Sequence, residues 1–241
     1  MTTYVFVLIV GLVAGALSGI IGTGSSIMLL PILVFQFGPK QAVPIMAIAA
    51  LMSNIGKVIA WRREIDWKAF SAYSMTGAPA AALGARTMLV LPSHIVDITL
   101  GLFFLAMIPC RRRLAMLNLR LSLWQLALAG GGIGFLTGIV MSTGPLSVPA
   151  FTSYGLLKGA FLSTEAASSL ALMVSKVTTF RSLGALPISS ILKGLIIGSS
   201  VMAGTFAGKE VVQRMSVKMF QYVLDVLLLC SGIAMLWVAI I

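Results

Sequence analysis

The chain has 241 residues, of which 59% are hydrophobic and only 10% are charged, and its mean hydropathy is +1.06. A soluble domain of this length has a polar surface to cover, so this composition excludes that class. The formal net charge of +11 reflects either basic loops that fix membrane topology or an electropositive path for anions. No basic folded face or tail for nucleic acid is present in the sequence.

Apolar stretches of membrane-spanning length recur along the sequence and predict an all-α polytopic membrane protein. The N-terminal stretch lacks the positive region of a cleaved signal peptide, so we expect a retained helix there. The apolar segments lie near residues 4–21, 25–38, 41–61, 69–90, 93–110, 122–141, 144–156, 160–180, 189–208 and 216–240.

Two of these segments, 25–38 and 144–156, are too short to cross a membrane. At 1.5 Å per residue each spans roughly 20 Å, whereas the hydrocarbon core is about 30 Å thick. Each follows a longer segment across a break rich in Gly, Ser and Thr. We therefore predict two half-helices, each forming a hairpin with its neighbour.

The same order of landmarks occurs twice in the chain, at an offset near 119 residues. The stretch "GALSG" (15–19) matches "GFLTG" (134–138), and "LMSNIGKVIAWR" (51–62) matches "LALMVSKVTTFR" (170–181). Apolar composition alone does not produce matches of several residue types in one order. The pattern predicts one integral membrane domain built from two homologous halves.

The halves are placed at 1–115 and 116–241, each with a broken-helix hairpin and three spanning helices. An odd number of crossings per half makes the two halves inverted repeats, with both chain termini outside. The positive-inside rule favours this arrangement, because the basic residues then gather on one side. That side holds Arg62, Arg63, Lys68, Arg111, Arg112, Arg113, Arg120, Lys158, Lys209, Arg214 and Lys218, and the other holds only Lys40, Arg86, Arg181 and Lys193.

The sequence offers few groups for catalysis. It contains one histidine, His94, and six acidic residues, and no His/Glu pair has the spacing of metal ligands on a helix. No phosphate-binding loop or nucleophile elbow occurs. Cys110 and Cys230 lie in apolar helical context and indicate neither a disulfide nor a metal site. We expect no enzyme, no cofactor and no metal.

The two breaks are typical of an anion transporter. In inverted-repeat transporters, half-helix ends near the membrane midplane present free N–H groups and positive dipole ends to an anionic substrate. Single serines in such breaks also act as ordinary caps of their own helices. The candidate substrate-binding residues in the breaks are Gly22, Thr23, Gly24, Ser25, Ser26, Ser142, Thr143 and Gly144.

Two lysines, Lys57 and Lys176, are equivalent in the repeat and lie shortly before the ends of their predicted helices. Each lysine side chain either extends to the membrane interface or lies at one entrance of a path for anions. Asn54 lies one turn before Lys57 and is a candidate for hydrogen bonds to substrate oxygens. The other half has Met173 at the equivalent position, so the two sites would differ.

Acidic residues inside the apolar segments are candidates for proton coupling. Asp225 lies deep in its segment, where an unpaired carboxylate is costly. Glu165 lies in the first turns of its helix, where a carboxylate also suits the helix dipole. Asp97 and His94 are weaker candidates of the same kind.

The layout resembles the TauE/SafE-type sulfite exporter family over essentially the whole chain. The similarity is carried by "GIIGTGSSIMLLPILVFQFGPKQAVPIMAIAALMSNIGKVIAW" (19–61) and its counterpart "GIVMSTGPLSVPAFTSYGLLKGAFLSTEAASSLALMVSKVTTF" (138–180). The family usually has more glycine in the breaks, where this sequence has serine and threonine. The resemblance implies export or exchange of sulfite, sulfonates or sulfoacetate.

These observations predict a multi-pass secondary transporter of a bacterial inner membrane. A small sulfur-containing anion would bind between the two breaks and cross by alternating access, driven by a proton or ion gradient. Homo-oligomerisation stays open. The alternatives are a passive anion channel with the same fold and a membrane assembly factor that transports nothing.

Overall fold

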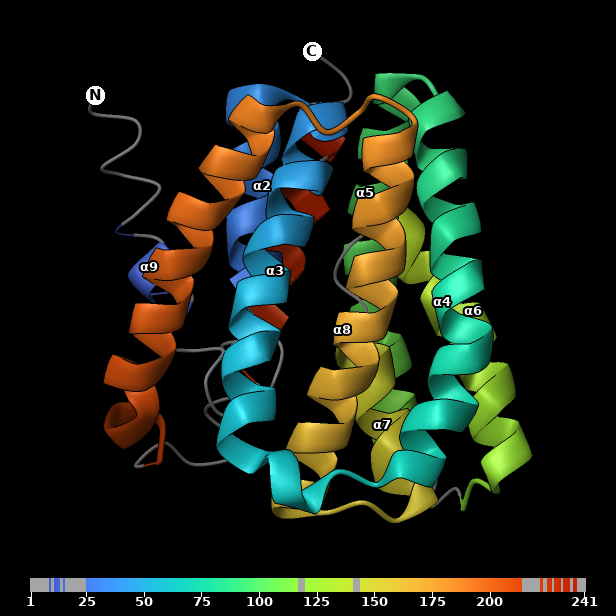
Figure 1. Cartoon of the computed structure of the whole chain (residues 1–241). Helices are drawn as coiled ribbons and strands as arrows, with labels where there is room; N and C mark the ends of the chain where they lie inside the picture. Colours follow the sequence, from blue (N-terminus) through green and yellow to red (C-terminus); the bar gives the residue numbers. More distant parts are fainter. Residues whose placement is uncertain are drawn as a thin grey trace.

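The computed structural model describes residues 25–116, 120–140 and 144–213, together with isolated residues of the first and last segments. Within this part of the chain the all-helical prediction is confirmed (Figure 1). The helices are α2 (Ser25–Phe37), α3 (Pro39–Trp61), the short 3₁₀-helix η1 (Arg62–Glu64), α4 (Trp67–Val90), α5 (Ser93–Met116), α6 (Leu123–Val140), α7 (Gly144–Tyr154), α8 (Lys158–Ser182) and α9 (Ile188–Gln213).

Three of the described helices contain stretches long and apolar enough to cross a membrane: Lys40–Ile59 in α3, Ser93–Cys110 in α5 and Leu123–Val140 in α6. Helix α8 is as long, with 25 residues, but it is more polar. Several of its polar side chains are nevertheless buried, and Glu165 and Lys176 are 4% and 0% exposed. Polar groups buried inside a membrane bundle are costly and mark functional sites, so α8 is the helix most suited to carry one.

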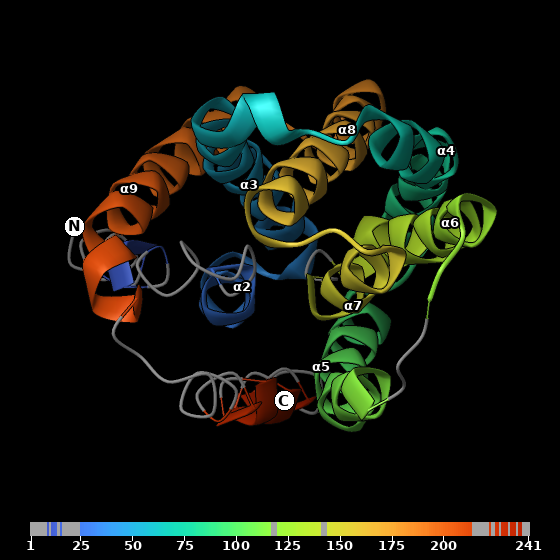
Figure 2. The same cartoon turned by 90° about the horizontal axis from the view of Figure 1, so that it is seen from below.

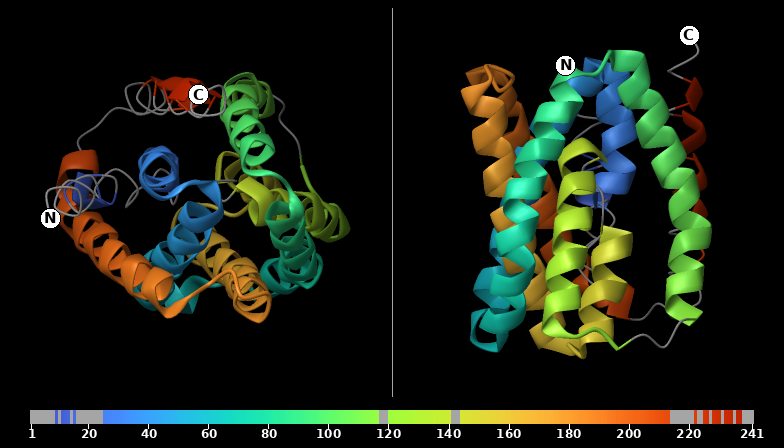
Figure 3. Two further views of the ribbon diagram at one scale, coloured as in Figure 1. Left: turned by 90° about the horizontal axis from the view of Figure 1, so that it is seen from above. Right: turned by 90° about the vertical axis from the view of Figure 1, so that its right-hand side faces the viewer.

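The two half-helices are present as predicted from their lengths, with 13 residues in α2 and 11 in α7. Each turns back into a long helix beside a glycine with positive φ, Gly38 at 72° and Gly155 at 108°. Only glycine adopts such angles without strain. The α2–α3 turn and the α7–α8 turn lie at opposite ends of the bundle (Figures 1 and 3).

Helices α3 and α8 lie side by side and run in opposite directions (Figures 1 and 2). Helix α9 packs against α3, and α4 packs against α8. Under the predicted division into 1–115 and 116–241, the contact between α3 and α8 would join one half to the other.

Close packing through glycine occurs in both halves. In α6, a Cβ on Gly134 would collide with the backbone of Gly77 in α4, and one on Gly138 with that of Ala81. In the first segment, a Cβ on Gly15 would collide with the backbone of Val201 in α9. Small residues allow such close approach of membrane helices. Gly15 and Gly134 correspond to each other at the offset of 119 residues. The first segment thus packs on α9 through a glycine whose counterpart in α6 packs on α4.

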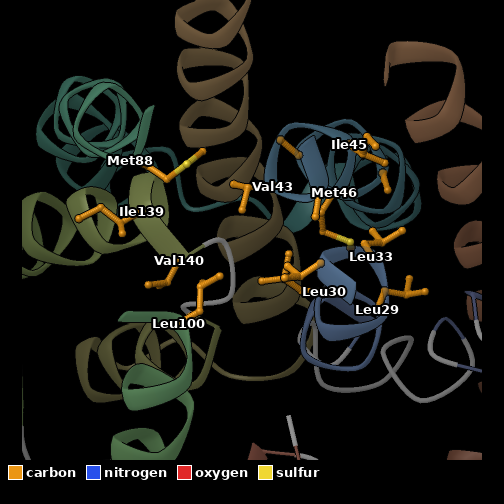
Figure 4. Packing of buried hydrophobic residues seen from close by; sticks show 14 of the residues in the cluster. Leu29, Leu30, Leu33, Val43, Ile45, Met46, Met88, Leu100, Ile139 and Val140 are labelled. Atoms are coloured by element: carbon orange, nitrogen blue, oxygen red, sulfur yellow. The ribbon is translucent and has the colours of Figure 1, made fainter. Parts of the chain in front are cut away.

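The apolar core extends from the α2–α3 hairpin to the ends of α4 and α6. Figure 4 shows Leu30 of α2 and Met46 of α3 on one side of it, and Met88 of α4 and Val140 of α6 on the other. All four side chains are at most 1% exposed. This packing holds α2 at a fixed place beside α3, which carries part of the site described next.

Candidate functional site

Glu165 lies at the centre of a buried hydrogen-bonded group on α8. Its Oε1 accepts hydrogen bonds from Ser169 Oγ, one turn along the same helix at 3.0 Å, and from Ser147 Oγ of α7 at 3.1 Å. Ser147 and Glu165 are both 4% exposed. The carboxylate therefore ties the half-helix α7 to α8.

Helix α3, which packs against α8, carries a lysine among its buried polar residues. The Nζ of Lys57 donates a hydrogen bond of 3.3 Å to Asn54 Oδ1 one turn earlier. Asn54 is 8% exposed, and Lys57 is half-buried. The structure thus joins two residues that were expected to bind substrate, Lys57 and Asn54, and packs their helix against the one that carries Glu165, which was expected to couple transport to protons.

Serine hydroxyls on the same helix faces are buried without a hydrogen-bond partner among the described residues. They are Ser53 Oγ on α3 and Ser168 Oγ on α8, which are 6% and 0% exposed. Ser53 lies four residues before Lys57, and Ser168 lies three residues after Glu165. Side chains at these spacings share one helix face. We name the six residues Ser53, Asn54, Lys57, Glu165, Ser168 and Ser169, with Ser147, the α3–α8 polar cluster.

This arrangement has the chemistry of a site for a small polar anion. Lys57 supplies a positive charge, and a buried hydroxyl without a partner gains from donating to a ligand oxygen. Such unsatisfied groups are uncommon in folded interiors and call for an explanation. A ligand with several acceptor oxygens, bound between α3 and α8, supplies one.

Lys176 lies apart from this cluster. Its Nζ donates a hydrogen bond of 2.6 Å to the backbone oxygen of Thr137 in the last turn of α6, and it lies 5.5 Å from the centre of the Phe180 ring. The side chain is 0% exposed, so it does not extend to the interface, and α8 continues to Ser182 beyond the predicted end. A cation at a helix C-terminus is favourable, and here it stabilises the end of α6 beside the second break.

The break residues are described only in part. Gly22, Thr23, Gly24, Ser142 and Thr143 lie outside the described residues. Ser25 and Ser26 begin α2, and the half-buried Gly144 begins α7. Whether the two breaks meet therefore stays a prediction. Asp225, the other coupling candidate, is a partly buried helical residue of the last segment.

Three further acids lie outside the α3–α8 polar cluster, and two of them have local roles. Asp66 caps α4 by accepting hydrogen bonds from the backbone N–H of Lys68 and Ala69, both at 3.0 Å. Glu64 lies against Gly159 in the first turn of α8, where a carboxylate suits the helix dipole. Asp97 is 4% exposed and its Oδ1 has no hydrogen-bond partner among the described residues.

The sequence analysis did not identify Ser147, Ser168 and Ser169. A signal for two of them was present, because Ser168 and Ser169 stand three and four residues after Glu165 and must share its helix face. No comparable signal pointed to Ser147, which reaches Glu165 only through the packing of α7 on α8.

A model of the family described as sulfite exporter TauE/SafE matches residues 7–235, which is essentially the whole chain. The chain belongs to the TauE/SafE sulfite exporter family. The expected resemblance is confirmed, and with the apolar helices it makes this a multi-pass membrane transporter of the sulfur-anion exporter type. No curated protein and no solved structure matches the chain. The family match says nothing about single residues, so the α3–α8 polar cluster rests on the geometry alone.

Proposed function

We propose that this TauE/SafE protein is a secondary transporter that moves a small sulfur-containing anion across a bacterial inner membrane by alternating access. Sulfite, sulfonates and sulfoacetate are the substrate types. The observation that carries the proposal is the α3–α8 polar cluster. In it Lys57 shares a face of α3 with the Ser53 hydroxyl, and α8 carries the Ser168 hydroxyl; both hydroxyls are buried without a partner among the described residues. A tetrahedral or pyramidal oxyanion matches one positive charge and several donors.

The two halves, 1–115 and 116–241, form inverted repeats in this proposal. Opposite directions of α3 and α8, the hairpin turns at opposite ends of the bundle, and the equivalent contacts of Gly15 and Gly134 support it. A two-fold relation of this kind is common among secondary transporters and lets one half rock against the other.

The substrate would bind where the two half-helices begin, near Ser25 and Gly144, and between the helices that carry Lys57 and Asn54. Free N–H groups at these helix starts add donors, and their dipoles favour negative charge. Lys176 would act at this site by holding the end of α6 in place rather than by contacting the anion.

Coupling to a proton or ion gradient is part of the same proposal, with Glu165 and Asp225 as candidate carriers. A passive anion channel differs from a secondary transporter because it cannot accumulate substrate against a gradient. A membrane assembly factor differs by transporting nothing, and its activity would not depend on Lys57.

Flux measurements with the purified full-length protein in proteoliposomes test these alternatives. We expect ³⁵S-labelled sulfite or isethionate to accumulate against its gradient, and an ionophore that dissipates the driving ion gradient to abolish accumulation. Flux that only equilibrates the anion indicates a channel, and absence of flux rejects transport. Lys57→Gln should lower flux at least about tenfold, because it removes the positive charge from the cluster. The matched control is Lys68→Gln on the exposed start of α4, which should transport like the wild type.

A further inference from the structure

The first turn of the half-helix α7 is tied to α8 through one serine. Ser147 Oγ has two acceptors within reach, Glu165 Oε1 at 3.1 Å and the backbone oxygen of Gly144 at 3.2 Å. We propose that Glu165 is a positioning residue of the anion site: through Ser147 it orients the start of α7, so that an oxyanion is bound jointly by backbone N–H groups of α7 and by the Ser168 hydroxyl. This inference rests on the proposed transport of an anion and names donors of that same site.

The start of α7 lies at the same level of the bundle as Ser168. Helices α7 and α8 form a hairpin that turns at Gly155, and Ser147 contacts Glu165 across it. Gly144 lies three residues before Ser147, and Ser168 lies three residues after the carboxylate. At 1.5 Å per residue, both are therefore roughly 4.5 Å farther from the turn. Ser168 also shares a helix face with Glu165, so it lies beside the place where α7 begins.

Donors without a charge come together at this place. Ser168 Oγ is 0% exposed and has no hydrogen-bond partner among the described residues. Such orphaned hydroxyls are uncommon in folded interiors, and a ligand oxygen would satisfy this one. The backbone N–H groups in the first turn of a helix have no partner within that helix. Because Pro145 has no N–H, Gly144 and Leu146 supply these donors, at the end of the α7 dipole that favours an anion.

The hydrogen bond to Glu165 gives α7 an orientation that apolar packing does not. Leu146, in the same first turn, packs against the apolar core. Apolar contact is non-directional, whereas a hydrogen bond has a preferred length and angle. The bond from Ser147 to Glu165 therefore fixes how the first turn is rotated, and with it the direction in which its N–H groups point.

Glu165 is itself held firmly enough to serve as an anchor. Ser169, one turn along α8, donates to the same Oε1 at 3.0 Å, and the Glu165 side chain is 4% exposed. A carboxyl oxygen accepts these two bonds whether the group is ionised or protonated. The positioning role is therefore separate from proton exchange by the same residue.

The predicted first half has an apolar contact at the corresponding place. When the prolines inside the two half-helices are matched, Ser147 corresponds to Leu29. At the offset of 119 residues, Glu165 corresponds to Met46. Both apolar side chains are 0% exposed and belong to one core. An apolar pair is therefore sufficient to hold a half-helix in this fold, and the polar pair of the second half fits a role in binding rather than in stability.

Loss of the Glu165 oxygen would leave neither serine without an acceptor. Ser147 keeps the backbone oxygen of Gly144, and Ser169 is able to donate to the backbone oxygen one turn earlier in α8. The thermal midpoint should therefore change little when Glu165 is replaced by a side chain of similar size. The affinity for the anion should change much more, because the start of α7 is no longer oriented.

Binding of ³⁵S-labelled sulfite and isethionate to the purified full-length protein in detergent tests the inference. Glu165→Met and Ser147→Ala should each raise the Kd about tenfold with little change in the thermal midpoint. The double variant should bind no more weakly than either single variant, because both substitutions remove the same bond. Glu165→Gln keeps an accepting oxygen and should restore the Kd to within about threefold of the wild type.

Ser168→Ala tests the proposed donor. It should raise the Kd about tenfold without lowering the thermal midpoint, because the hydroxyl has no partner to lose in the empty protein. Ser163→Ala is the matched control. Ser163 is equally buried on the same helix, but its hydroxyl donates to the backbone oxygen of Gly159 at 2.8 Å, so this variant should bind like the wild type.

Three outcomes would overturn the inference and leave the proposed function standing. They are wild-type affinity in Glu165→Met, binding by Glu165→Gln that is as weak as by Glu165→Met, and wild-type affinity in Ser168→Ala. The two serine variants remove single hydroxyls, so the test remains if Glu165→Met folds poorly. Absence of both binding and flux of sulfite and isethionate in the wild type rejects the proposed function itself.

Discussion

The ammonium of Lys176 donates a 2.6 Å hydrogen bond to the backbone oxygen of Thr137, joining the C-terminal part of α8 to the last turn of α6. Both residues are almost fully buried, at 0% and 3% exposed. Helix α6 ends three residues later at Val140, and the second Gly/Ser break follows. The lysine thus fixes the position at which the chain leaves α6.

Replacing Lys176 by Met should destabilise the protein. The carbonyl of Thr137 loses its buried donor, which costs about 1–3 kcal/mol. Thermal unfolding in detergent should show a lower midpoint than for the wild type. Lys68→Met, at an exposed lysine, is the control and should leave the midpoint unchanged. An unchanged midpoint in Lys176→Met with lost flux would instead place this lysine in the substrate path.

Replacing Gly134 by Ala should weaken the contact between α4 and α6. The added Cβ collides with the backbone of Gly77, and such overpacking costs about 1–3 kcal/mol. Gly132→Ala on the same helix is the matched control, because nothing lies within 4 Å of its added Cβ. That control should unfold at the same temperature or higher, since alanine favours the helix. Equal midpoints for the two variants would contradict the close packing.

Replacing Asn54 by Met, its counterpart in the second half, should impair substrate binding. Lys57 loses the oxygen that orients it, and a hydrogen bond to a charged group is worth about 1.5–3 kcal/mol. The KM for sulfite in proteoliposomes should rise about tenfold, and the thermal midpoint should fall because the same hydrogen bond is lost from the folded protein. Ile55→Met, at the exposed neighbouring position, should behave like the wild type. A KM that rises equally in both variants would rule out a specific role for Asn54.

The inverted arrangement predicts that the C-terminus lies outside the cytoplasm. Alkaline phosphatase fused after Ile241 should be active in a bacterial host, and a fluorescent protein that matures only in the cytoplasm should be dark. A fusion after Arg120, within the basic loop between α5 and α6, supplies the opposite control. Fluorescence from the protein fused at the C-terminus would contradict the predicted topology.

Helix positions could be predicted well because turn-forming and polar residues separate the apolar segments along much of the chain. The predicted segments 25–38 and 69–90 correspond to α2 (Ser25–Phe37) and α4 (Trp67–Val90). The largest difference is α5, which continues to Met116 through three arginines beyond the predicted end at 110. Apolarity marks only the part of a helix that suits lipid, whereas arginine is itself a good helix former.

The candidate site could be predicted residue by residue but not as one cluster. Lys57, Asn54 and Glu165 stood out because polar groups are rare in apolar segments. That Glu165 accepts a hydrogen bond from Ser147 depends on how α7 packs on α8, and no pattern within either helix encodes that packing. The equivalence of Lys57 and Lys176 suggested similar environments. In the structure, however, Lys57 donates to a side-chain amide on its own helix, whereas Lys176 donates to a backbone oxygen of α6.

The contact between α3 and α8 brings together two helices whose polar residues differ at corresponding positions of the predicted halves. At the offset of 119, the counterpart of Glu165 is Met46, and the counterpart of Asn54 is Met173. Both methionines are buried in the apolar core. Under the predicted division, a dimer of the first half would therefore contain two lysines and no carboxylate at these positions, and a dimer of the second half would lack the amide. We expect that neither half alone sustains the function even when it is overproduced as a dimer.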